Sequence, residues 1–238
     1  MTGAMVKNAL VRGVIEGYTA EGMGVARVDG MAVFVPCTAR GDECLIRIVK
    51  VLKNRAYGRL EELLSPSEHR QTPACPAFPR CGGCDFWHLS YEEELFLKRR
   101  RVEDALRRLG GFDVSVPAVV PSPQVQRYRN KAVFPFGRQD GRAVFGFYRS
   151  RSHDIVPICD CLIQDARAPR LASAVCRWAD ETGAPEYDEK TGRGLVRAIF
   201  VRTGGEGAQL CLAVTSPRIP MPDRLIALCR SACPDLRG

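Results

Sequence analysis

The sequence has few lysines and no long apolar run, and both observations limit the classes of protein to which it can belong. Its 238 residues include no stretch approaching the roughly 18 to 20 uninterrupted apolar residues of a transmembrane helix. The opening stretch, MTGAMVKNALVRGVIEG, lacks the apolar segment of a secretory signal peptide. Internal repeats and low-complexity segments are also absent from the sequence. We therefore expect a cytoplasmic protein that does not enter a membrane.

Lysine is scarce because arginine supplies most of the positive charge. Counting along the sequence gives 6 lysines among 35 basic residues, which leaves 29 arginines, and the formal net charge is +8. The planar guanidinium fits phosphate through two-point contacts, so an arginine-rich surface suits nucleic acid. Excess charge also improves solubility, and a GC-rich genome favours arginine codons. Charge alone leaves these interpretations open.

Cysteine, in contrast, is abundant. A chain of this length buries enough apolar surface to fold without disulfides, and thiols in the cytoplasm stay reduced. Eleven cysteines in such a chain therefore favour metal binding where they are clustered. Isolated cysteines are more simply read as small buried apolar residues.

Residues 10–62 read as short β-strands separated by turn signals such as Asp29–Gly30. This pattern predicts a small antiparallel barrel whose rim carries basic residues, including Lys50 and Lys53. An ordinary solvated face would look the same. Residues 64–76 contain three prolines and turn-forming residues, which predict a linker and a domain boundary near residue 65. We expect an α+β fold with domains at 1–65 and 66–238.

The clearest helix follows the cysteine cluster, in SYEEELFLKRRRVEDALRRLGG. Ser90 is placed to cap its N-terminus, and Glu93 three residues later completes the pattern of a capping box. One helical face carries an apolar stripe, formed by Leu95, Val102, Leu106 and Leu109. Amphipathic helices usually bury such a stripe, so we expect it to belong to the core.

The second domain is expected to contain an antiparallel sheet with helices. Residues 127–163 alternate basic with aromatic or β-branched residues around the turn pair Asp140–Gly141, which predicts a hairpin with one cationic face. A helix is expected at about 168–180, a hairpin at about 195–215, and a short helix from Pro222.

Three cysteines in CPAFPRCGGC have the spacing C-x5-C-x2-C, and CDCLIQ offers two more, of which one can complete a four-thiolate site. Four thiolates suit either Zn²⁺ or a [4Fe–4S] cluster, and the spacing does not separate them. A cluster of cysteines that binds no metal is the third alternative, because cysteine is also a small buried apolar residue. Enzymes that generate radicals from S-adenosylmethionine (SAM) characteristically use C-x3-C-x2-C instead. The residues concerned are Cys75, Cys81, Cys84, Cys159 and Cys161.

These segments resemble the RNA uracil-5-methyltransferase family, whose members modify uridine in 23S ribosomal RNA or transfer RNA. The resemblance rests on the block from CPAFPRCGGC to ALRRLGG, then YRNKAVFPF, GFYRSRSHDIV and CDCLIQ, in that order. Residues 10–62, with EGMGVARVDGMAVFVP, resemble the OB-like TRAM domain that opens many of these enzymes. Residues 66–238 then correspond to the iron–sulfur central domain, incomplete at its C-terminal end.

The resemblance implies ligands, partners and chemistry. The [4Fe–4S] ligands of the family fall on Cys75, Cys81, Cys84 and Cys161, with Cys159 as the alternative fourth ligand. In the family, a cysteine thiolate adds to C6 of a flipped-out uracil, C5 takes the methyl group of SAM, and a base removes the C5 proton. RNA, ribosomal rather than transfer, is the implied partner, and its contacts are expected at Lys50, Lys53, Arg127, Arg129, Asn130, Lys131 and Arg149.

The sequence departs from the family in its catalytic parts. The glycines of TGGEGAQLCLAV fit a hairpin tip better than a SAM-binding turn, and Cys233 beside Pro234 lacks the surroundings of the family's nucleophile. We therefore expect no catalytic or SAM-binding residue here, and SAM only through a missing domain. The chain would be the RNA-binding, iron–sulfur front portion of a methyltransferase, inactive alone, which a separately encoded methyltransferase domain could complete. The alternatives are a free-standing RNA-binding module with an iron–sulfur or zinc site and, less favoured, a radical-SAM-type enzyme.

Overall fold

The chain folds as two compact units. A computed structural model describes residues 5–238. Unit 1 comprises the chain up to Pro79 together with Cys84–Pro121, and unit 2 comprises Arg80–Gly83 and Ser122–Gly238. The boundary expected near residue 65 stays a prediction about domains, since the compact units divide the chain further along. Each unit is described by itself below.

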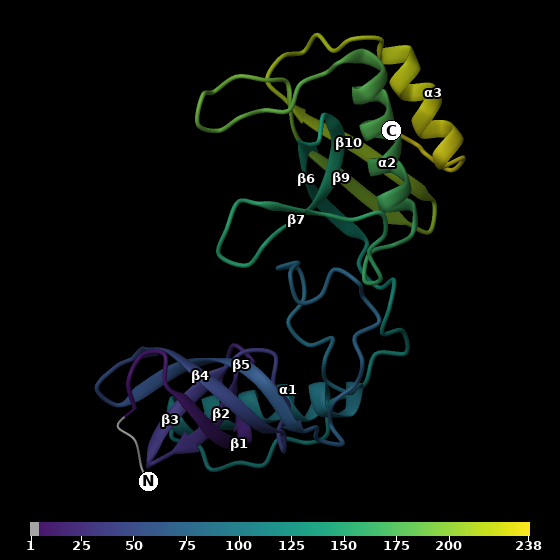
Figure 1. The fold of residues 1–238 in the computed structure, drawn as a ribbon. Coiled ribbons are helices and arrows are strands. Elements are labelled where there is room, and N and C mark those ends of the chain that lie inside the picture. The colour runs from purple at the N-terminus through teal and green to yellow at the C-terminus, as the bar shows by residue number, and fades with distance from the viewer. Residues whose placement is uncertain (1–4) are drawn as a thin grey trace. The chain divides into compact units, whose positions relative to one another are not determined.

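In unit 1, five strands within the described residues form a closed barrel in the order β1-β2-β3-β5-β4 (Figure 1). Ile15, Val33 and Ile46 are fully buried inside it. The expected antiparallel barrel needs one correction, because β3 pairs with β5 in parallel and this pair closes the barrel. The strands are β1 (Leu10–Tyr18), β2 (Gly24–Val28), β3 (Met31–Val35), β4 (Glu43–Val51) and β5 (Arg55–Ser65).

The expected helix forms as α1 (Tyr91–Arg108). The Ser90 hydroxyl oxygen accepts a hydrogen bond from the Glu93 amide at 3.2 Å, which confirms the N-cap. The capping box is only half formed, because the Ser90 amide donates to the His69 carbonyl at 2.8 Å. The Glu93 carboxylate is thereby left for other partners.

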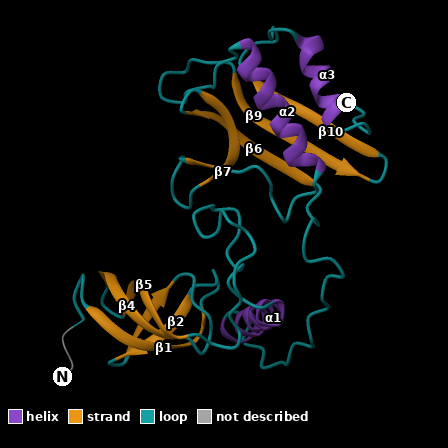
Figure 2. Ribbon diagram, turned by 45° about the vertical axis from the view of Figure 1, so that its right-hand side comes forward, coloured by secondary structure: helices purple, strands orange, loops and turns teal. Residues whose placement is uncertain are grey.

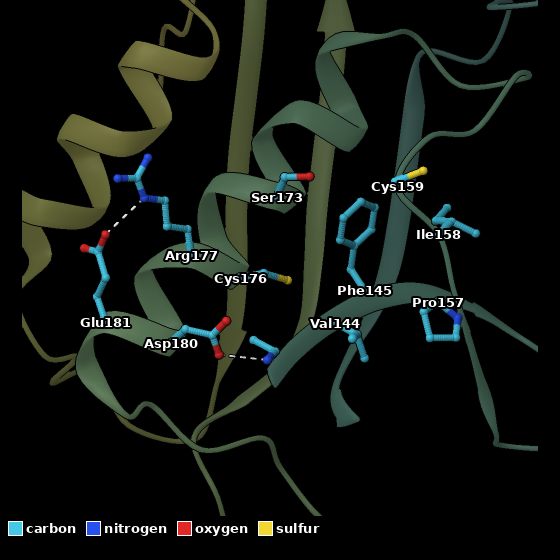
Figure 3. Close-up of a pocket in the computed structure, with 11 residues that line it drawn as sticks. Val144, Phe145, Pro157, Ile158, Cys159, Ser173, Cys176, Arg177, Asp180 and Glu181 are labelled. Carbon is cyan, nitrogen blue, oxygen red and sulfur yellow. Dashed lines mark hydrogen bonds and ion pairs between the residues drawn. The ribbon is translucent and has the colours of Figure 1, made fainter. Parts of the chain in front are cut away.

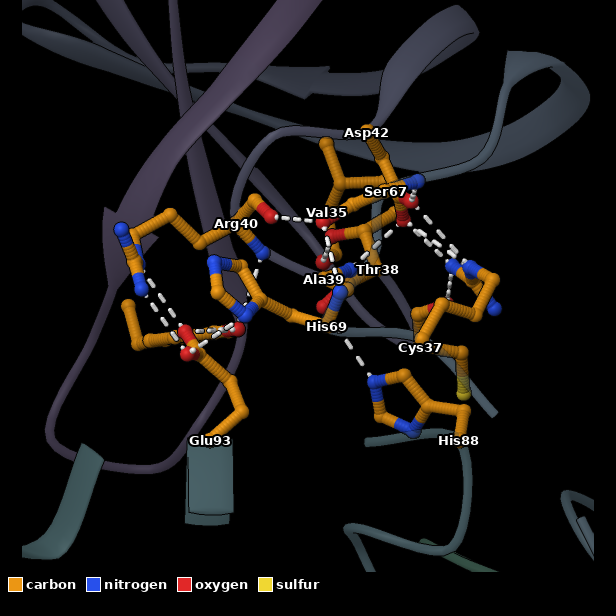
Figure 4. Close-up of polar contacts among 12 residues, drawn as sticks. Val35, Cys37, Thr38, Ala39, Arg40, Asp42, Ser67, His69, His88 and Glu93 are labelled. Carbon is orange, nitrogen blue, oxygen red and sulfur yellow. Dashed lines mark hydrogen bonds and ion pairs between the residues drawn. The ribbon is translucent and has the colours of Figure 1, made fainter. Parts of the chain in front are cut away.

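Glu93 links α1 to the barrel through a buried carboxylate (Figure 4). Its side chain is 2% exposed and accepts hydrogen bonds from Arg40 Nε at 3.0 Å, Arg40 Nη2 at 2.9 Å and the Tyr18 hydroxyl at 2.9 Å. His69 Nδ1 lies 3.3 Å from the same carboxylate. Arg40 also lies over the Phe96 ring of α1, 4.4 Å from its centroid. The helix is therefore held by directed polar contacts.

A second buried carboxylate, Asp42, fixes the segment after the barrel. It accepts hydrogen bonds from the amides of Ala39 at 2.7 Å and Ser67 at 2.9 Å, and from the Arg70 guanidinium. The proline-containing segment expected to be a linker is thus attached to the barrel over residues 67–70.

The apolar stripe of α1 is not core, which corrects the expectation from its periodicity. Val102 is 49% exposed and Leu109 is 88% exposed. The buried positions of the helix are Glu93, Leu97 and Glu103. Glu103 pairs with Arg99 of the same helix at 3.1 Å, whereas Glu93 pairs with Arg40 outside the helix at 2.9 Å. The pair with Arg40 therefore makes the side of α1 that carries Glu93 an inward one.

Unit 2 is a five-stranded sheet in the order β10-β9-β6-β7-β8, with two helices side by side over one face (Figure 2). The expected hairpins and helices all form, with Asp140 and Gly141 at positive φ in the turn between β6 and β7. The elements are β6 (Lys131–Gln139), β7 (Arg142–Tyr148), β8 (Ile155–Pro157), α2 (Arg167–Thr182), β9 (Val196–Gly204), β10 (Gly207–Val214) and α3 (Pro222–Ala232).

The core of unit 2 lies between this sheet and its helices. Trp178 of α2 is fully buried with Phe134 of β6 and Ile199 of β9, and Leu228 of α3 joins the same cluster. Since side chains alternate across a strand, the neighbours of Phe134 and Ile199 point to the opposite face of the sheet. No helix within residues 5–238 is long and apolar enough to cross a lipid bilayer.

Candidate nucleic-acid interface

The sheet face opposite the helices carries a row of cations. Lys131 of β6 is the cross-strand partner of Arg202 on β9, and Arg202 in turn is paired in register with Gln209 of β10. All three residues are exposed. Like charges on directly opposite residues repel each other, so a bound anion would stabilise this pair. The row offers two phosphate-binding cations beside an amide that can recognise a base edge.

The next row on this face is apolar and contains an aromatic ring. Phe200 of β9 lies between Val133 of β6 and Cys211 of β10 in the register of the sheet. Val133 is 37% exposed, and Phe200 is half-buried. An aromatic ring beside cations on an open sheet is an arrangement on which unpaired RNA bases stack. We call the two rows together the open face: Lys131, Val133, Phe200, Arg202, Gln209 and Cys211.

Sequence reasoning located Lys131 but missed Arg202 and Phe200. The alternation in VRAIFVRT marks these two as residues of one strand face. The alternation does not show which strand pairs with this one, so the sequence alone could not place Arg202 and Phe200 beside Lys131.

Arg129 and Asn130 lead into β6 at the edge of the open face. The Arg129 amide donates to the Ile163 carbonyl at 2.9 Å, while the Asn130 carbonyl accepts from the Thr203 amide at 2.8 Å. Both residues are exposed. Their backbones are fixed by these hydrogen bonds, which leaves the Arg129 side chain beside the open face as a candidate RNA contact.

The Arg127 side chain binds the Asp160 carboxylate. Its guanidinium donates to both carboxylate oxygens of Asp160 at 2.7 and 2.6 Å, and to the Cys161 carbonyl at 2.9 Å. The Arg127 guanidinium beside it holds the pKa of the Asp160 carboxyl below its usual range. Arg127 therefore fixes the loop that carries Cys161, and a role in RNA contact stays a prediction.

Arg149 follows β7, and the segment 80–83 pairs with the chain here. Cys81 forms an antiparallel bridge with Arg149, and the Gly82 amide donates to the Tyr148 carbonyl at 3.0 Å. A Cβ on Gly82 would lie 2.8 Å from that carbonyl oxygen and 2.9 Å from the Ser150 nitrogen, so a residue without a side chain is required.

The barrel of unit 1 carries a second basic and aromatic surface. Lys50 of β4 is paired in register with Tyr57 of β5, and Lys53 is exposed in the turn between these strands. Tyr57 and Phe34 meet edge to face at 5.5 Å between ring centroids. Both rings lie opposite the buried positions of their strands, on the outside of the barrel. The sequence analysis chose the two lysines and missed the aromatic pair beside them.

The candidate metal ligands are distributed over both units. Cys75 and Cys84 belong to unit 1, and Cys81 and Cys161 belong to unit 2. Within residues 5–238, no group of three or more His, Cys, Asp or Glu side chains is arranged to hold a metal ion. The donor set still has the chemistry of a cluster site, because thiolates bind iron and the Gly83 amide lies 3.4 Å from Cys81 Sγ, as a donor to that sulfur.

A cavity of about 570 Å³ lies between α2 and β7 and is mostly apolar (Figure 3). Its polar groups are already paired: Asp180 accepts from the Ala143 amide at 2.8 Å, and Glu181 from Arg177 at 3.1 Å. Burial raises the pKa of the Cys176 thiol in its wall to about 12, so this thiol is protonated and non-nucleophilic at neutral pH. Cys159, the alternative fourth cluster ligand, lines the same cavity and is exposed.

Comparisons with known proteins support the nucleic-acid interpretation. Residues 12–60 match the TRAM domain family. An uncharacterized RNA methyltransferase of Clostridium tetani is 36% identical over 222 residues, which are 92% of this chain and 48% of that protein. One from Bacillus cereus is 37% identical over 94% of this chain and 49% of its own length. The chain is a relative of RNA methyltransferases.

A solved structure agrees with this relationship. The tRNA (uracil-54, C5)-methyltransferase of Pyrococcus abyssi, determined in complex with S-adenosyl-L-homocysteine, matches with a TM-score of 0.67 and 25% identity. The match covers 90% of this chain and 48% of that methyltransferase. The present chain therefore spans about half the length of the RNA methyltransferases that it matches.

Proposed function

We propose that this chain binds RNA for a SAM-dependent methyltransferase that modifies C5 of uridine. The observation that carries the proposal is the open face, where Lys131, Arg202 and Phe200 combine phosphate-binding cations with a stacking surface. The RNA methyltransferase relatives and the uracil-C5 methyltransferase structure support the choice of reaction. Ribosomal RNA is the substrate class we favour, and transfer RNA is the alternative.

In this proposal the residues described here hold and orient RNA. SAM, when bound to the methyltransferase, supplies the methyl group. Arg129, Asn130 and Lys131 bind the RNA backbone at the start of β6, and Arg149 binds it near the end of β7. Lys50 and Lys53 offer a separate basic surface on the barrel. Binding alone does not accelerate attack at C5, because a lower barrier needs interactions that strengthen in the transition state.

We also propose a [4Fe–4S] cluster on Cys75, Cys81, Cys84 and Cys161. The thiolate donor set and the amide donor beside Cys81 support it, and Arg127 holds the backbone next to Cys161. When bound, such a cluster would crosslink the chain, and the family resemblance gives it no part in methyl transfer. Zinc in place of the cluster is the alternative that the same ligands allow.

The test of the proposed function compares RNA substrates and products. Fluorescence anisotropy with a uridine-containing single-stranded RNA, a transfer RNA T-arm hairpin and a fully paired duplex should show weakest binding to the duplex, because bases must be unpaired to stack. We expect residues 1–238 with labelled SAM to form no 5-methyluridine. Equal binding to the duplex would contradict an interface built on stacking, and methylation would place the chemistry within this chain.

A further inference from the structure

A groove of about 750 Å³ lies in unit 2 beside the open face. Its walls come from β6, β7 and β8, the loop after β7, residues 186–190, and Arg80. Gly137 and Gln139 of β6 line it and, by strand alternation, lie on the same side of β6 as Lys131 and Val133. Phe136 and Arg138, which alternate to the other side of β6, line the groove as well. The groove therefore lies farther along the strand that carries Lys131 and Val133.

Two arginines line the groove, from chain segments that are paired with each other. Arg80 and Arg149 both line it and both are exposed. The antiparallel bridge between Cys81 and Arg149, with the hydrogen bond from Gly82 to Tyr148, fixes the two backbone segments side by side. No ion pair within residues 5–238 engages either guanidinium. The two side chains are thus available to an anion.

Four acidic side chains also line the groove, namely Asp154, Glu186, Asp188 and Glu189, and two of them have the following partners. Asp188 accepts from the Lys190 amide at 2.8 Å and from the Thr191 hydroxyl at 3.0 Å. Glu189 lies 3.5 Å from Arg197 and 3.6 Å from His153 Nδ1. These contacts reduce the repulsion that an incoming phosphate would meet in the groove.

An aromatic ring, that of Tyr148, also lines the groove. Tyr148 is 40% exposed, and its ring lies 5.2 Å from that of His153, tilted by 34°. A partly exposed tyrosine supported by a second ring keeps its position without a ligand and offers a face for stacking. A nucleobase has both the flat face and the attached phosphate that these residues would recognise.

We propose that this groove binds one unpaired nucleotide of the RNA, with its base against Tyr148 and its phosphate on Arg80 and Arg149. The inference rests on the proposed function, because it assumes that RNA occupies the open face. It adds a recognition site for a single nucleotide, in which Arg149 acts together with Arg80 and Tyr148.

The first measurement is photo-crosslinking of the full chain to single-stranded RNA that contains 4-thiouridine, followed by mass spectrometry of the crosslinked peptides. We expect a crosslink in the peptide that contains Tyr148 and His153, in addition to any on the open face. Failure of the wild-type chain to bind RNA would overturn both proposals. RNA binding with crosslinks confined to the open face would overturn the groove alone.

Variants make the same distinction quantitatively. Tyr148→Ala should weaken RNA binding about tenfold, the loss of one stacked base, whereas Tyr148→Phe should retain it. Arg80→Ala with Arg149→Ala should lower the magnitude of the salt slope by about 0.7, the value for one phosphate of a single strand. Arg218→Ala is the matched control, since Arg218 is exposed in unit 2 and does not line the groove. Equal effects of Tyr148→Ala and Tyr148→Phe, or of the control and the double variant, would refute the assignment.

Discussion

Replacing Glu93 by glutamine should loosen α1 from the barrel. The substitution keeps the size of the side chain and removes the charge that accepts from Arg40 through two hydrogen bonds at 3.0 and 2.9 Å. It also places an amide group where Tyr18 and His69 approach a carboxylate. Breaking one partner of a fully buried pair typically costs about 3–5 kcal/mol.

Partial exposure of the Arg40 side chain reduces the loss of stability expected from Glu93→Gln. The Arg40 side chain is 34% exposed, so water compensates part of its charge, and we expect about 2 kcal/mol. That free energy corresponds to roughly thirtyfold faster opening of the helix, since about 1.4 kcal/mol is a factor of ten. The expected change is large enough to resolve in a single-residue comparison.

Hydrogen exchange of the α1 amides, followed by mass spectrometry, measures this opening directly. Glu94→Gln is the matched control, because Glu94 pairs with Lys98 in the same helix at 2.6 Å, and such pairs contribute about 0.3–0.5 kcal/mol. We expect fast exchange in Glu93→Gln and near wild-type exchange in Glu94→Gln. Indistinguishable exchange in the two variants would refute the role given to Glu93.

Two further predictions concern the cysteines and the acid stability of unit 2. Protein purified without oxygen should be brown and contain iron and sulfide. The Cys161→Ser variant should lose the iron and sulfide, whereas the Cys159→Ser variant should keep both. Stoichiometric zinc without sulfide would contradict the cluster. Hydrogen bonds from Arg167 lower the pKa of Asp165 to about 2. Because the folded pKa is lowered, this carboxylate stabilises unit 2 above about pH 4 and the benefit is lost as pH falls toward 2. Asp165→Asn should therefore cost about 1–2 kcal/mol at pH 7 and nothing near pH 2, as measured by urea unfolding at each pH; a constant difference between the two proteins would exclude the mechanism.

Local signals in the sequence predicted most of the elements. Asp29–Gly30 and Asp140–Gly141 both adopt the positive φ angles of tight hairpin turns, and these short pairs locate four strands. The N-cap at Ser90 is equally local. Strand β5 falls mostly within residues 10–62, but its bounds and its parallel partner were not readable, since RAYGRLEELLS alternates weakly and the strand is defined by its pairing with β3 and β4.

The sequence predictions failed at positions whose burial or neighbours depend on residues far away in the chain. The stripe on α1 obeys helical periodicity, yet Arg40 of the barrel makes the face with Glu93 the buried one. In the candidate site, Lys131 was visible as part of a basic segment, while its neighbour Arg202 became evident only from the register between β6 and β9. Tyr148 was visible as a residue of a motif, but its place in a groove with Arg80 depends on the bridge at Cys81.

The most direct test of the central claim measures RNA binding by the open face as a function of salt. Lys131→Ala with Arg202→Ala should weaken binding to single-stranded RNA and lower the magnitude of the salt slope by about 1.4. Arg230→Ala removes an exposed charge from α3, on the helix-covered side of the sheet, and should leave both quantities unchanged. We expect the double variant to differ from the wild-type chain in both quantities, and the control to match the wild-type chain. Equal salt slopes for the wild-type chain, the double variant and the control would contradict it.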